Sequence, residues 1–167
     1  YNPSTATSPC VNDLDAVSGG SSSGAAASVA FNLAAAGIGT DTGGSVRIPA
    51  AWNDLVGLKT TSQRLMLEGV VPLALKFDTV GPLCRSVEDA GLLLAAMEGT
   101  ASADLRHADL NGRHFAVLKT VALDDLRDEP RAAFEAAVAK LAQAGAVIEE
   151  IEVPEVSEVL TLATCVF

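Results

Sequence analysis

Two glycine- and serine-rich segments, Gly19–Gly24 and Thr40–Ser45, flank a run of strong helix formers in this chain of 167 residues. The run "AAASVAFNLAAAG" predicts a helix that ends at Gly37, and the serines before it suit the unpaired N–H groups of a helix N-terminus. A helix followed by a short strand returns the chain close to its starting level. We therefore expect the two segments to meet, although Ser21 and Ser45 lie 24 residues apart.

The rest of the chain alternates between strand and helix patterns. Strand patterns cover residues 54–61, 114–119 and 146–154, and helix patterns cover 85–99, 128–145 and 155–167. The helix at 85–99 has the strongest signals, because Ser86 and Asp89 stand at capping-box spacing and Gly99 closes it. The apolar stretch 64–83 is interrupted by glycine and proline, which is typical of a segment that wraps a core. This alternation predicts an α/β fold.

Composition excludes several classes of function. With 49% hydrophobic and 19% charged residues, the chain is typical of a globular protein, and polar residues interrupt its longest apolar stretch, so no membrane span is expected. A formal net charge of −10 argues against direct binding of nucleic acid. The widely spaced Cys10, Cys84 and Cys165 indicate neither a disulfide framework nor a zinc site, and favour a reduced, cytoplasmic setting.

The two ends are unusual for a natural domain. The chain begins with Tyr1, and its last helix pattern ends on the apolar residues Cys165, Val166 and Phe167. An apolar end of this kind needs a surface to pack against. We therefore expect the chain to be a piece of a longer one.

The two glycine- and serine-rich segments supply the groups that acyl transfer needs. Both carry serine hydroxyls beside glycines, and glycine leaves backbone N–H groups uncovered. If the segments meet, hydroxyls and N–H groups converge on one point, as acyl transfer requires. Ser45, which directly follows Gly43 and Gly44, is then a candidate nucleophile, although a lone Gly-Gly-Ser is more commonly a turn with no catalytic role.

The order of the motifs resembles the amidase signature family, whose members are serine hydrolases of carboxylic amides. The motifs are "GGSSSGAAASVA", "GIGTDTGGSVRIPA", "GLKTT" and "FDTVGPLCRSVEDA", and the close match covers about residues 17–98. The resemblance implies an α/β/α fold in which helices cover a mixed β-sheet core. It also implies that residues 1–167 are part of a single amidase domain, without its N-terminal region, which holds the catalytic lysine, and without its C-terminal portion.

By this resemblance, Ser45 matches the family's nucleophile, and Ser21 matches the bridging serine that follows a cis peptide bond. A serine hydroxyl is a weak nucleophile until a base accepts its proton, and a second serine can relay that proton to a neutral lysine. The family's lysine lies upstream of the first glycine-serine segment. No role is assigned to the lysines of this chain, Lys59, Lys76, Lys119 and Lys140.

The resemblance also assigns an oxyanion hole to backbone N–H groups of the second segment, at Thr42, Gly43 and Gly44. Asp41 and Arg47 flank this loop with opposite charges, and we interpret them as supports that fix its shape. Ser22 is interpreted as a residue that helps to orient the proton relay, although helix capping would also explain a serine at this position.

The expected function is that of an amidase, which converts a small-molecule amide into an acid and ammonia or an amine through a serine acyl-enzyme, without metal or organic cofactor. Two alternatives remain open within the resemblance. One is an A-type amidotransferase subunit that acts on glutamine, and the other is a homologue that binds without hydrolysing. A homodimer is also left open.

A different catalytic arrangement would use the G-x-S-x-G pattern of α/β-hydrolases. In "GSSSG" at 20–24 the nucleophile would be Ser22, with Asp78 or Asp89 as the acid and His107 or His114 as the base. The segment before it is a poor buried strand, which disfavours this interpretation. Both histidines are expected at exposed or strand-edge positions.

Three further features have simple structural interpretations. A phosphate-binding loop is disfavoured because no G-K-[ST] sequence follows the glycines. The acidic residues Asp124, Asp125, Asp128 and Glu129 suit a solvated helix N-terminus better than a cation site. Trp52, Phe77 and Met97 are expected in the core, and Phe77 alternatively at the border of a substrate pocket.

Overall fold

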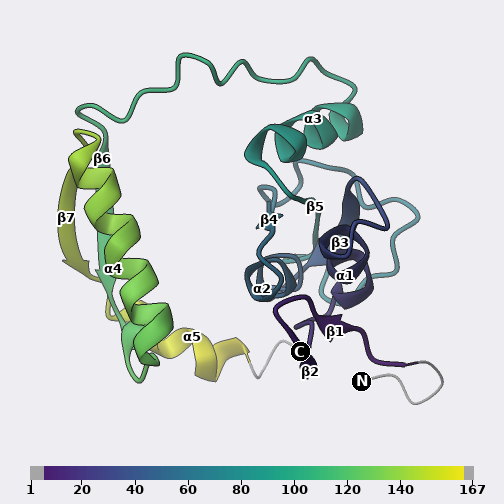
Figure 1. Ribbon diagram of the computed structural model, residues 1–167, viewed down its shortest axis with the longest axis horizontal. Coiled ribbons are helices and arrows are strands. Elements are labelled where there is room, and N and C mark those ends of the chain that lie inside the picture. Colours follow the sequence, from purple (N-terminus) through teal and green to yellow (C-terminus); the bar gives the residue numbers. More distant parts are fainter. Residues whose placement is uncertain (1–5, 164–167) are drawn as a thin grey trace. The chain divides into compact units, whose positions relative to one another are not determined.

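The computed structural model describes residues 6–163, and the chain divides into two compact units, Tyr1–Leu105 and Arg106–Phe167 (Figure 1). The predicted positions of Cys165, Val166 and Phe167 lie outside the described residues. Among the described residues, no helix is long and apolar enough to cross a membrane.

Over residues 6–105, the first unit contains two separate antiparallel sheets. Its strands are β1 (Pro9–Cys10), β2 (Asp13–Val17), β3 (Gly37–Asp41), β4 (Val56–Gly57) and β5 (Thr79–Cys84), and its helices are α1 (Ser23–Ala30), α2 (Arg47–Trp52) and α3 (Val87–Glu98). β1 pairs with β2, and β5 lies between β3 and β4 in the three-stranded sheet. Residues from α1, α2 and β5 form the buried core of the unit, together with the residue before α2, namely Ala26, Val46, Ala50 and Leu83.

The pairing of β3 with β5 brings residues of two sequence motifs to the same edge of the sheet. Asp41, the last residue of β3, pairs with Thr79, the first residue of β5. Strands in an antiparallel pair run past each other, so the residue after Asp41 and the residue before Thr79 emerge at the same edge of the sheet. Those residues are Thr42 and Asp78.

The helix after the first glycine-serine segment is shorter than predicted. α1 ends at Ala30, Asn32 takes a positive φ of 60°, and Gly37 begins β3 instead of capping the helix. A Cβ at Gly37 would lie 3.1 Å from the backbone oxygen of Ala25, so this glycine permits β3 to pass close to α1. Close approach, and not helix termination, explains the glycine.

Of the other elements predicted in the first unit, the helix at 85–99 is confirmed, whereas the strand at 54–61 forms only in part. α3 is confirmed with both of its caps, since the Ser86 side chain accepts the N–H of Asp89 at 3.0 Å and Gly99 takes a left-handed φ of 67°. Only the two residues of β4 form a strand within 54–61. The stretch 64–83 contributes a long loop and most of β5.

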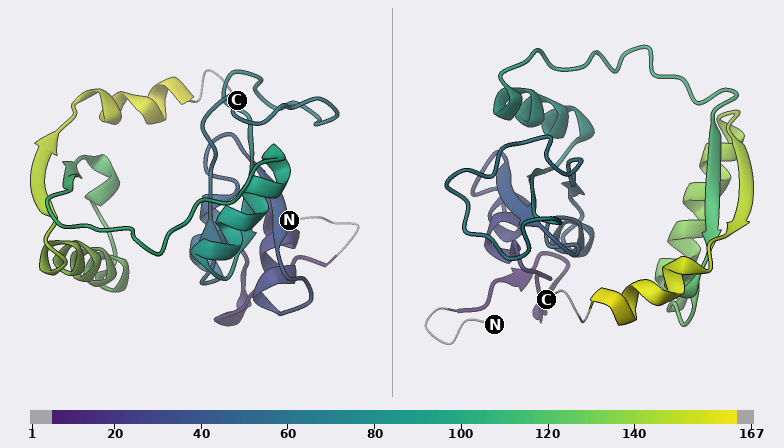
Figure 2. Two further views of the ribbon diagram at one scale, coloured as in Figure 1. Left: turned by 90° about the horizontal axis from the view of Figure 1, so that it is seen from above. Right: turned by 180° about the vertical axis from the view of Figure 1, so that it is seen from behind.

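The second unit is a β-α-β arrangement followed by a helix. β6 (His114–Lys119), α4 (Asp128–Gln143), β7 (Val147–Glu152) and α5 (Glu155–Ala163) follow in that order, with a short 3₁₀ turn at Val121–Leu123. β6 and β7 are parallel, and α4 runs along them (Figures 1 and 2). The strands and the helices predicted here are confirmed within the described residues, and α5 covers the predicted helix 155–167 as far as Ala163. Parallel and antiparallel pairs together give the α/β character of the chain.

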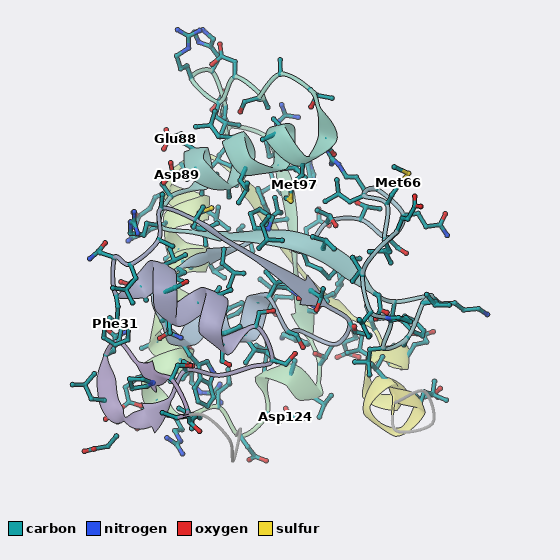
Figure 3. All side chains as sticks on the ribbon, turned by 90° about the vertical axis from the view of Figure 1, so that its right-hand side faces the viewer. Phe31, Met66, Glu88, Asp89, Met97 and Asp124 are labelled. Carbon is teal, nitrogen blue, oxygen red and sulfur yellow. The ribbon has the colours of Figure 1, made fainter. Side chains whose placement is uncertain are left out.

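The prediction that Trp52 and Phe77 belong to the core is wrong. The exposed fractions of these two residues are 50% and 48%, so about half of each lies on the surface of the described part of the chain. Met97 is half-buried on α3, whereas Met66 points away from the unit on the long loop (Figure 3).

A buried carboxylate holds the loop between β3 and α2. Asp41 has no exposed surface, and its oxygens accept the N–H groups of Gly44 at 2.8 Å and Val46 at 3.2 Å. The Arg47 guanidinium donates to both oxygens, from Nε at 2.9 Å and from Nη2 at 3.0 Å. Burial raises the pKa of Asp41, but these hydrogen bonds outweigh it and hold the pKa below its ordinary value.

We predict that Gly81→Ala destabilises the protein by about 2 kcal/mol or more. A Cβ at this position of β5 would overlap the carbonyl oxygen of Leu58, which belongs to the backbone and cannot rotate away. Urea unfolding followed by circular dichroism measures the change. Gly91→Ala is the matched control, because its nearest neighbour would lie 3.7 Å away and alanine favours the helix by up to about 1 kcal/mol. Equal stability of the two variants would contradict the prediction.

We predict that Asp41→Asn lowers the free energy of unfolding at neutral pH by about 2 kcal/mol or more, because charged hydrogen bonds to Arg47 and to the loop are lost. A carboxyl whose pKa is lowered by folding stabilises the native state above its unfolded pKa, and this contribution is lost as the pH falls through the folded pKa. The difference between the variant and the wild type should therefore narrow below about pH 3.8, the ordinary pKa of the group.

Urea unfolding at a series of pH values tests this expectation. Asp13→Asn is the control, because Asp13 is exposed and its carboxylate accepts the N–H of Asp15 at 3.0 Å, a bond between neighbouring residues on the surface. A difference between Asp41→Asn and the wild type that stays constant down to the lowest pH would refute the role of the charge.

Candidate active site

A small cavity of about 40 Å³ lies where the two glycine- and serine-rich segments meet. Its polar wall comes from both segments and from the start of β5, and its apolar wall comes from the long loop before β5. The lining residues are Ser21, Thr40, Thr42, Ser45, Leu67, Val70, Val71, Leu73, Asp78 and Thr79.

The structure brings Ser21 and Ser45 onto this one cavity, as the sequence predicted. The segments are joined directly, because the N–H of Ser22 donates to the carbonyl oxygen of Ser45 at 3.1 Å. The Gly20–Ser21 peptide bond is cis, which matches the feature that the resemblance implied for this position. At Gly19 φ is +74°, and a Cβ there would lie 3.0 Å from the Cα of Pro49. Glycine is thus needed for the first segment to pass against α2.

Ser22 is not among the residues that line the cavity. It is the N-cap residue of α1, yet its side chain makes no capping bond and instead donates to the carbonyl oxygen of Thr40 at 3.3 Å. A Cβ at Gly39 would come within 2.5 Å of the Ser22 Oγ, so this contact depends on the glycine. The side chain of Ser22 therefore ties the first segment to β3.

The alternative arrangement with Ser22 as nucleophile has no support in this geometry. The preceding strand, β2, is largely exposed, whereas a nucleophile elbow follows a buried strand. His107 is exposed, and His114 contacts Glu149 through Nδ1 at 3.2 Å on β6 and β7. Both histidines occupy the surface positions that the sequence predicted.

One of the backbone donors predicted beside Ser45 is already engaged within the loop. The N–H of Gly44 is donated to Asp41, so the prediction that Gly44 supplies an oxyanion donor is not supported. Its φ of +125° and its close approach to the Ile48 side chain give it a conformational role instead. Within residues 6–163, no acceptor takes the N–H groups of Thr42, Gly43 or Ser45.

Asp78 also lines the cavity, although the sequence indicated a role for it only as the acid of the alternative arrangement. It is 5% exposed, and its Oδ1 accepts the hydroxyl of Thr42 at 2.5 Å. Its oxygens also accept the N–H groups of Leu73 at 2.8 Å and Ala74 at 3.0 Å. The hydrogen bond from Thr42 is the main reason why the pKa of Asp78 lies below its ordinary value. The motif "FDTVGP" contains Asp78, but nothing in it indicates a partner 36 residues away.

Neither a lysine nor a metal site accompanies the cavity in the described part of the chain. No lysine lines it, and the Lys59 Nζ donates to the carbonyl oxygen of Thr60 at 2.7 Å. Across residues 6–163, no group of three His, Cys, Asp or Glu side chains could hold a metal ion. Of the four acidic residues predicted at a helix N-terminus, Asp128 and Glu129 lie in the first turn of α4, whereas Asp124 and Asp125 precede the helix.

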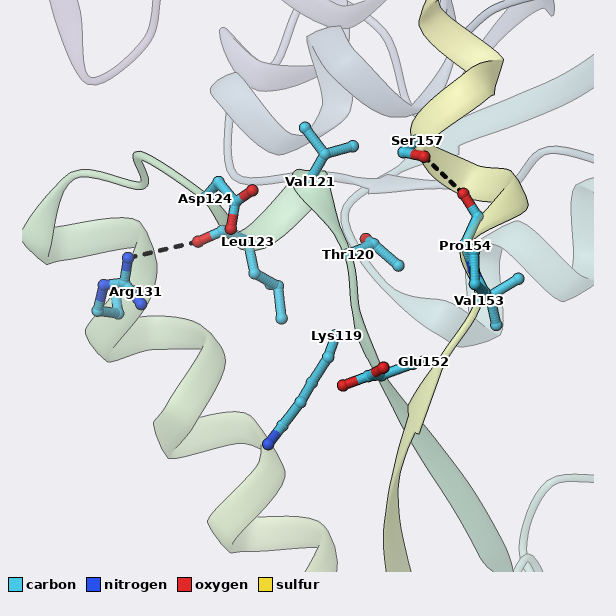
Figure 4. A pocket seen from close by; sticks show the side chains of 10 residues that line it. All are labelled: Lys119, Thr120, Val121, Leu123, Asp124, Arg131, Glu152, Val153, Pro154 and Ser157. Carbon is cyan, nitrogen blue, oxygen red and sulfur yellow. Dashed lines mark hydrogen bonds between the residues drawn. The ribbon is translucent and has the colours of Figure 1, made fainter.

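The second unit has a larger cavity of about 590 Å³ between the ends of β6 and β7 and the start of α5 (Figure 4). Its lining contains none of the predicted site residues. Two of its polar side chains are already engaged, since Arg131 donates to the carbonyl oxygen of Leu123 at 3.3 Å and Ser157 to that of Pro154 at 2.6 Å. The chemistry predicted from the sequence thus gathers in the smaller cavity of the first unit.

Several known proteins are similar to this chain in sequence and in fold. A family model described as Amidase matches residues 2–166. The A subunit of the glutamyl-tRNA(Gln) amidotransferase of Roseobacter denitrificans is 39% identical over 149 residues, which is 81% of this chain and 30% of that protein. The protein of the same name from Halorhodospira halophila is 40% identical over 155 residues, which is 85% of this chain and 32% of that protein.

Two solved structures extend the similarity to the fold. The A subunit of the glutamyl-tRNA(Gln) amidotransferase of Thermotoga maritima has a TM-score of 0.87 and 29% identity, covering 95% of this chain and 38% of that one. Native peptide amidase from Stenotrophomonas maltophilia has a TM-score of 0.73 and 32% identity, covering 97% of this chain and 37% of that one. The chain spans 30–32% of the length of the curated relatives named above. Since the family model covers residues 2–166, the chain belongs to the amidase signature family, as the order of its motifs predicted.

Proposed function

We propose that this chain carries the nucleophile and the relay serine of an amidase that hydrolyses a carboxylic amide. The observation that carries the proposal is the convergence of Ser21 and Ser45 on one cavity, where the Ser22 N–H bonds the Ser45 carbonyl oxygen at 3.1 Å. Two hydroxyls beside backbone N–H groups that are open to a ligand are the arrangement that nucleophilic acyl transfer uses.

In the proposed reaction, the Ser45 Oγ attacks the amide carbonyl carbon while its proton passes to the Ser21 hydroxyl. Ser21 passes its own proton to a lysine that lies outside this chain. The N–H groups of Thr42, Gly43 and Ser45 stabilise the oxyanion, a contribution for which one donor is typically worth about 100-fold to 1,000-fold in rate. The proton then returns to the leaving nitrogen as the C–N bond breaks, and water releases the acid from the acyl-enzyme.

Asp41, Arg47 and Ser22 support this arrangement without touching the substrate. Asp41 accepts hydrogen bonds from the N–H of Gly44 and from Nε and Nη2 of Arg47. These bonds fix the turn that presents Ser45. Ser22 fixes the first segment through its bond to the Thr40 carbonyl oxygen. We propose that these contacts keep the two serines in register.

We further propose that both units belong to one amidase domain, which the family match over residues 2–166 supports. A cytoplasmic location is also proposed. The free thiols of Cys10 and Cys84 favour it, because reducing compartments preserve free thiols. A homodimer stays a prediction.

A second candidate function is that of an A-type amidotransferase subunit. The relatives of 39% and 40% identity are named as the A subunit of a glutamyl-tRNA(Gln) amidotransferase, and the solved structure of TM-score 0.87 carries the same name. The amide would then be that of glutamine, and further subunits would be partners. Release of ammonia from glutamine by the full-length protein, compared with its release from a simple aliphatic amide, separates this function from that of a general amidase. A homologue that binds without hydrolysing would release ammonia from neither.

We predict that a serine-reactive fluorophosphonate labels the full-length protein and that Ser45→Ala abolishes the label, because Ser45 is the only proposed nucleophile. Gel fluorescence and mass spectrometry of the labelled peptide measure this. Ser22→Ala should keep the label, since Ser22 does not line the cavity and its hydroxyl is donated to the carbonyl oxygen of Thr40. Labelling that survives Ser45→Ala but disappears with Ser22→Ala would support the nucleophile elbow and contradict this proposal.

We predict that Ser21→Ala lowers kcat for amide hydrolysis by about 100-fold to 10,000-fold, because the proton of Ser45 loses its relay. Steady-state kinetics on the full-length protein measures the loss. Ser23→Ala, at the first position of α1, is the matched control and should stay within about twofold of the wild type. A Ser21→Ala variant with wild-type kcat would exclude the relay, even if Ser45 still carried the label.

A further inference from the structure

The hydroxyl of Thr42 has a fixed direction because its partner is a carboxylate. An ionised carboxylate only accepts hydrogen bonds, so the single proton of Thr42 points to the Asp78 Oδ1, 2.5 Å from the hydroxyl oxygen. Asp78 is kept ionised by this bond and by the N–H groups of Leu73 and Ala74, which hold its pKa below the ordinary value. The Thr42 oxygen is therefore left with lone pairs alone.

These lone pairs belong to a residue that lines the cavity beside Ser45. Thr42 is half-buried, and so remains reachable from the cavity that it shares with Ser21 and Ser45. The Thr79 hydroxyl also donates its proton, to the carbonyl oxygen of Asp41 at 2.7 Å, but only 3% of Thr79 is exposed. Both threonines already donate their hydroxyl protons, and of the two, Thr42 is the one whose oxygen a ligand in the cavity can reach.

An amide can donate a hydrogen bond to this acceptor through its N–H, whereas an ester cannot. Both substrates present a carbonyl oxygen to the N–H groups of the loop, but only an amide carries an N–H on the other side of the carbonyl carbon. A site with donors for the oxygen and one oriented acceptor beside them complements both groups. Sites that pair a substrate N–H discriminate against analogues that lack it, because the acceptor is then left unpaired.

We propose that the Thr42 hydroxyl, with its proton held by Asp78, accepts a hydrogen bond from the N–H of the scissile amide and so favours amides over esters. This inference rests on the proposed function, since it assumes that Ser45 is the nucleophile. Asp78 is a positioning residue in this account, because it acts only through Thr42.

The test compares an amide with its matched ester, butyramide and ethyl butyrate, on the full-length protein. Thr42→Val removes the hydroxyl at nearly constant volume. It should lower kcat/KM for the amide about 10-fold more than kcat/KM for the ester, which is the difference expected for one hydrogen bond that only the amide makes. Asp78→Asn should act in the same direction, because an asparagine N–H can donate to Thr42 and turn its proton toward the cavity.

Two further variants separate positioning from a general loss of structure. Thr42→Ser keeps the hydroxyl and should restore the amide-to-ester ratio to within about twofold of the wild type. Thr100→Val is the matched control, because Thr100 also pairs with a carboxylate, that of Glu98 at 3.5 Å, on the exposed surface. The double variant of Thr42→Val and Asp78→Asn should lower the amide-to-ester ratio of kcat/KM no further than either single variant, since both substitutions remove the same interaction.

The outcomes distinguish this inference from the proposed function. Activity that disappears with Ser45→Ala, together with an amide-to-ester ratio unchanged by Thr42→Val, would overturn the role of Thr42 alone. Equal losses on both substrates would do the same, because they would indicate that Thr42 holds a serine hydroxyl instead. A wild-type protein that hydrolyses neither substrate, or a Ser45→Ala variant that hydrolyses both, would overturn the proposed function.

Discussion

The carboxylate of Asp41 is the contact on which the arrangement around Ser45 depends. It has no exposed surface, and it binds backbone N–H groups of the loop together with the guanidinium of Arg47. A buried carboxylate is costly unless it is paired and hydrogen-bonded, and here the loop itself supplies the partners. The loop can therefore hold its shape only in the conformation that satisfies the charge. That conformation places Ser45 on the cavity.

The rest of the first unit brings the second serine to this loop. α1 ends early and β3 passes close to it at Gly37, so the chain returns to the level of Ser21 within a short distance. Gly39 leaves room for the Ser22 side chain, and Gly81 leaves room for the Leu58 carbonyl. These glycines have one function in common, which is to let neighbouring segments approach more closely than a side chain would permit.

Features encoded locally could be predicted from the sequence. The capping signals of α3, the helix that starts at Asp128 and the strand at 114–119 each depend on neighbouring residues, and all three were confirmed. The meeting of the two glycine-serine segments could also be predicted, because a helix and a strand between them leave few other paths. Features that depend on distant contacts could not. The end of α1 was misplaced because Gly37 serves the packing of β3, and a glycine needed for packing looks the same in sequence as one that caps a helix. The partnership of Thr42 with Asp78 joins residues 36 positions apart and follows from the pairing of β3 with β5.

Two buried carboxylates thus bind different residues of one short loop. Asp41 binds donors from the glycine side, including the Gly44 N–H that was expected to face an oxyanion, whereas Asp78 takes the proton of the Thr42 hydroxyl and leaves an acceptor. Neither carboxylate has to touch a substrate to have this effect. Since an amide carries an acceptor and a donor on adjacent atoms, a loop polarised in this way complements an amide more fully than a carbonyl compound without N–H. The charges that stabilise the loop and the polarity that it presents to a substrate therefore have the same origin.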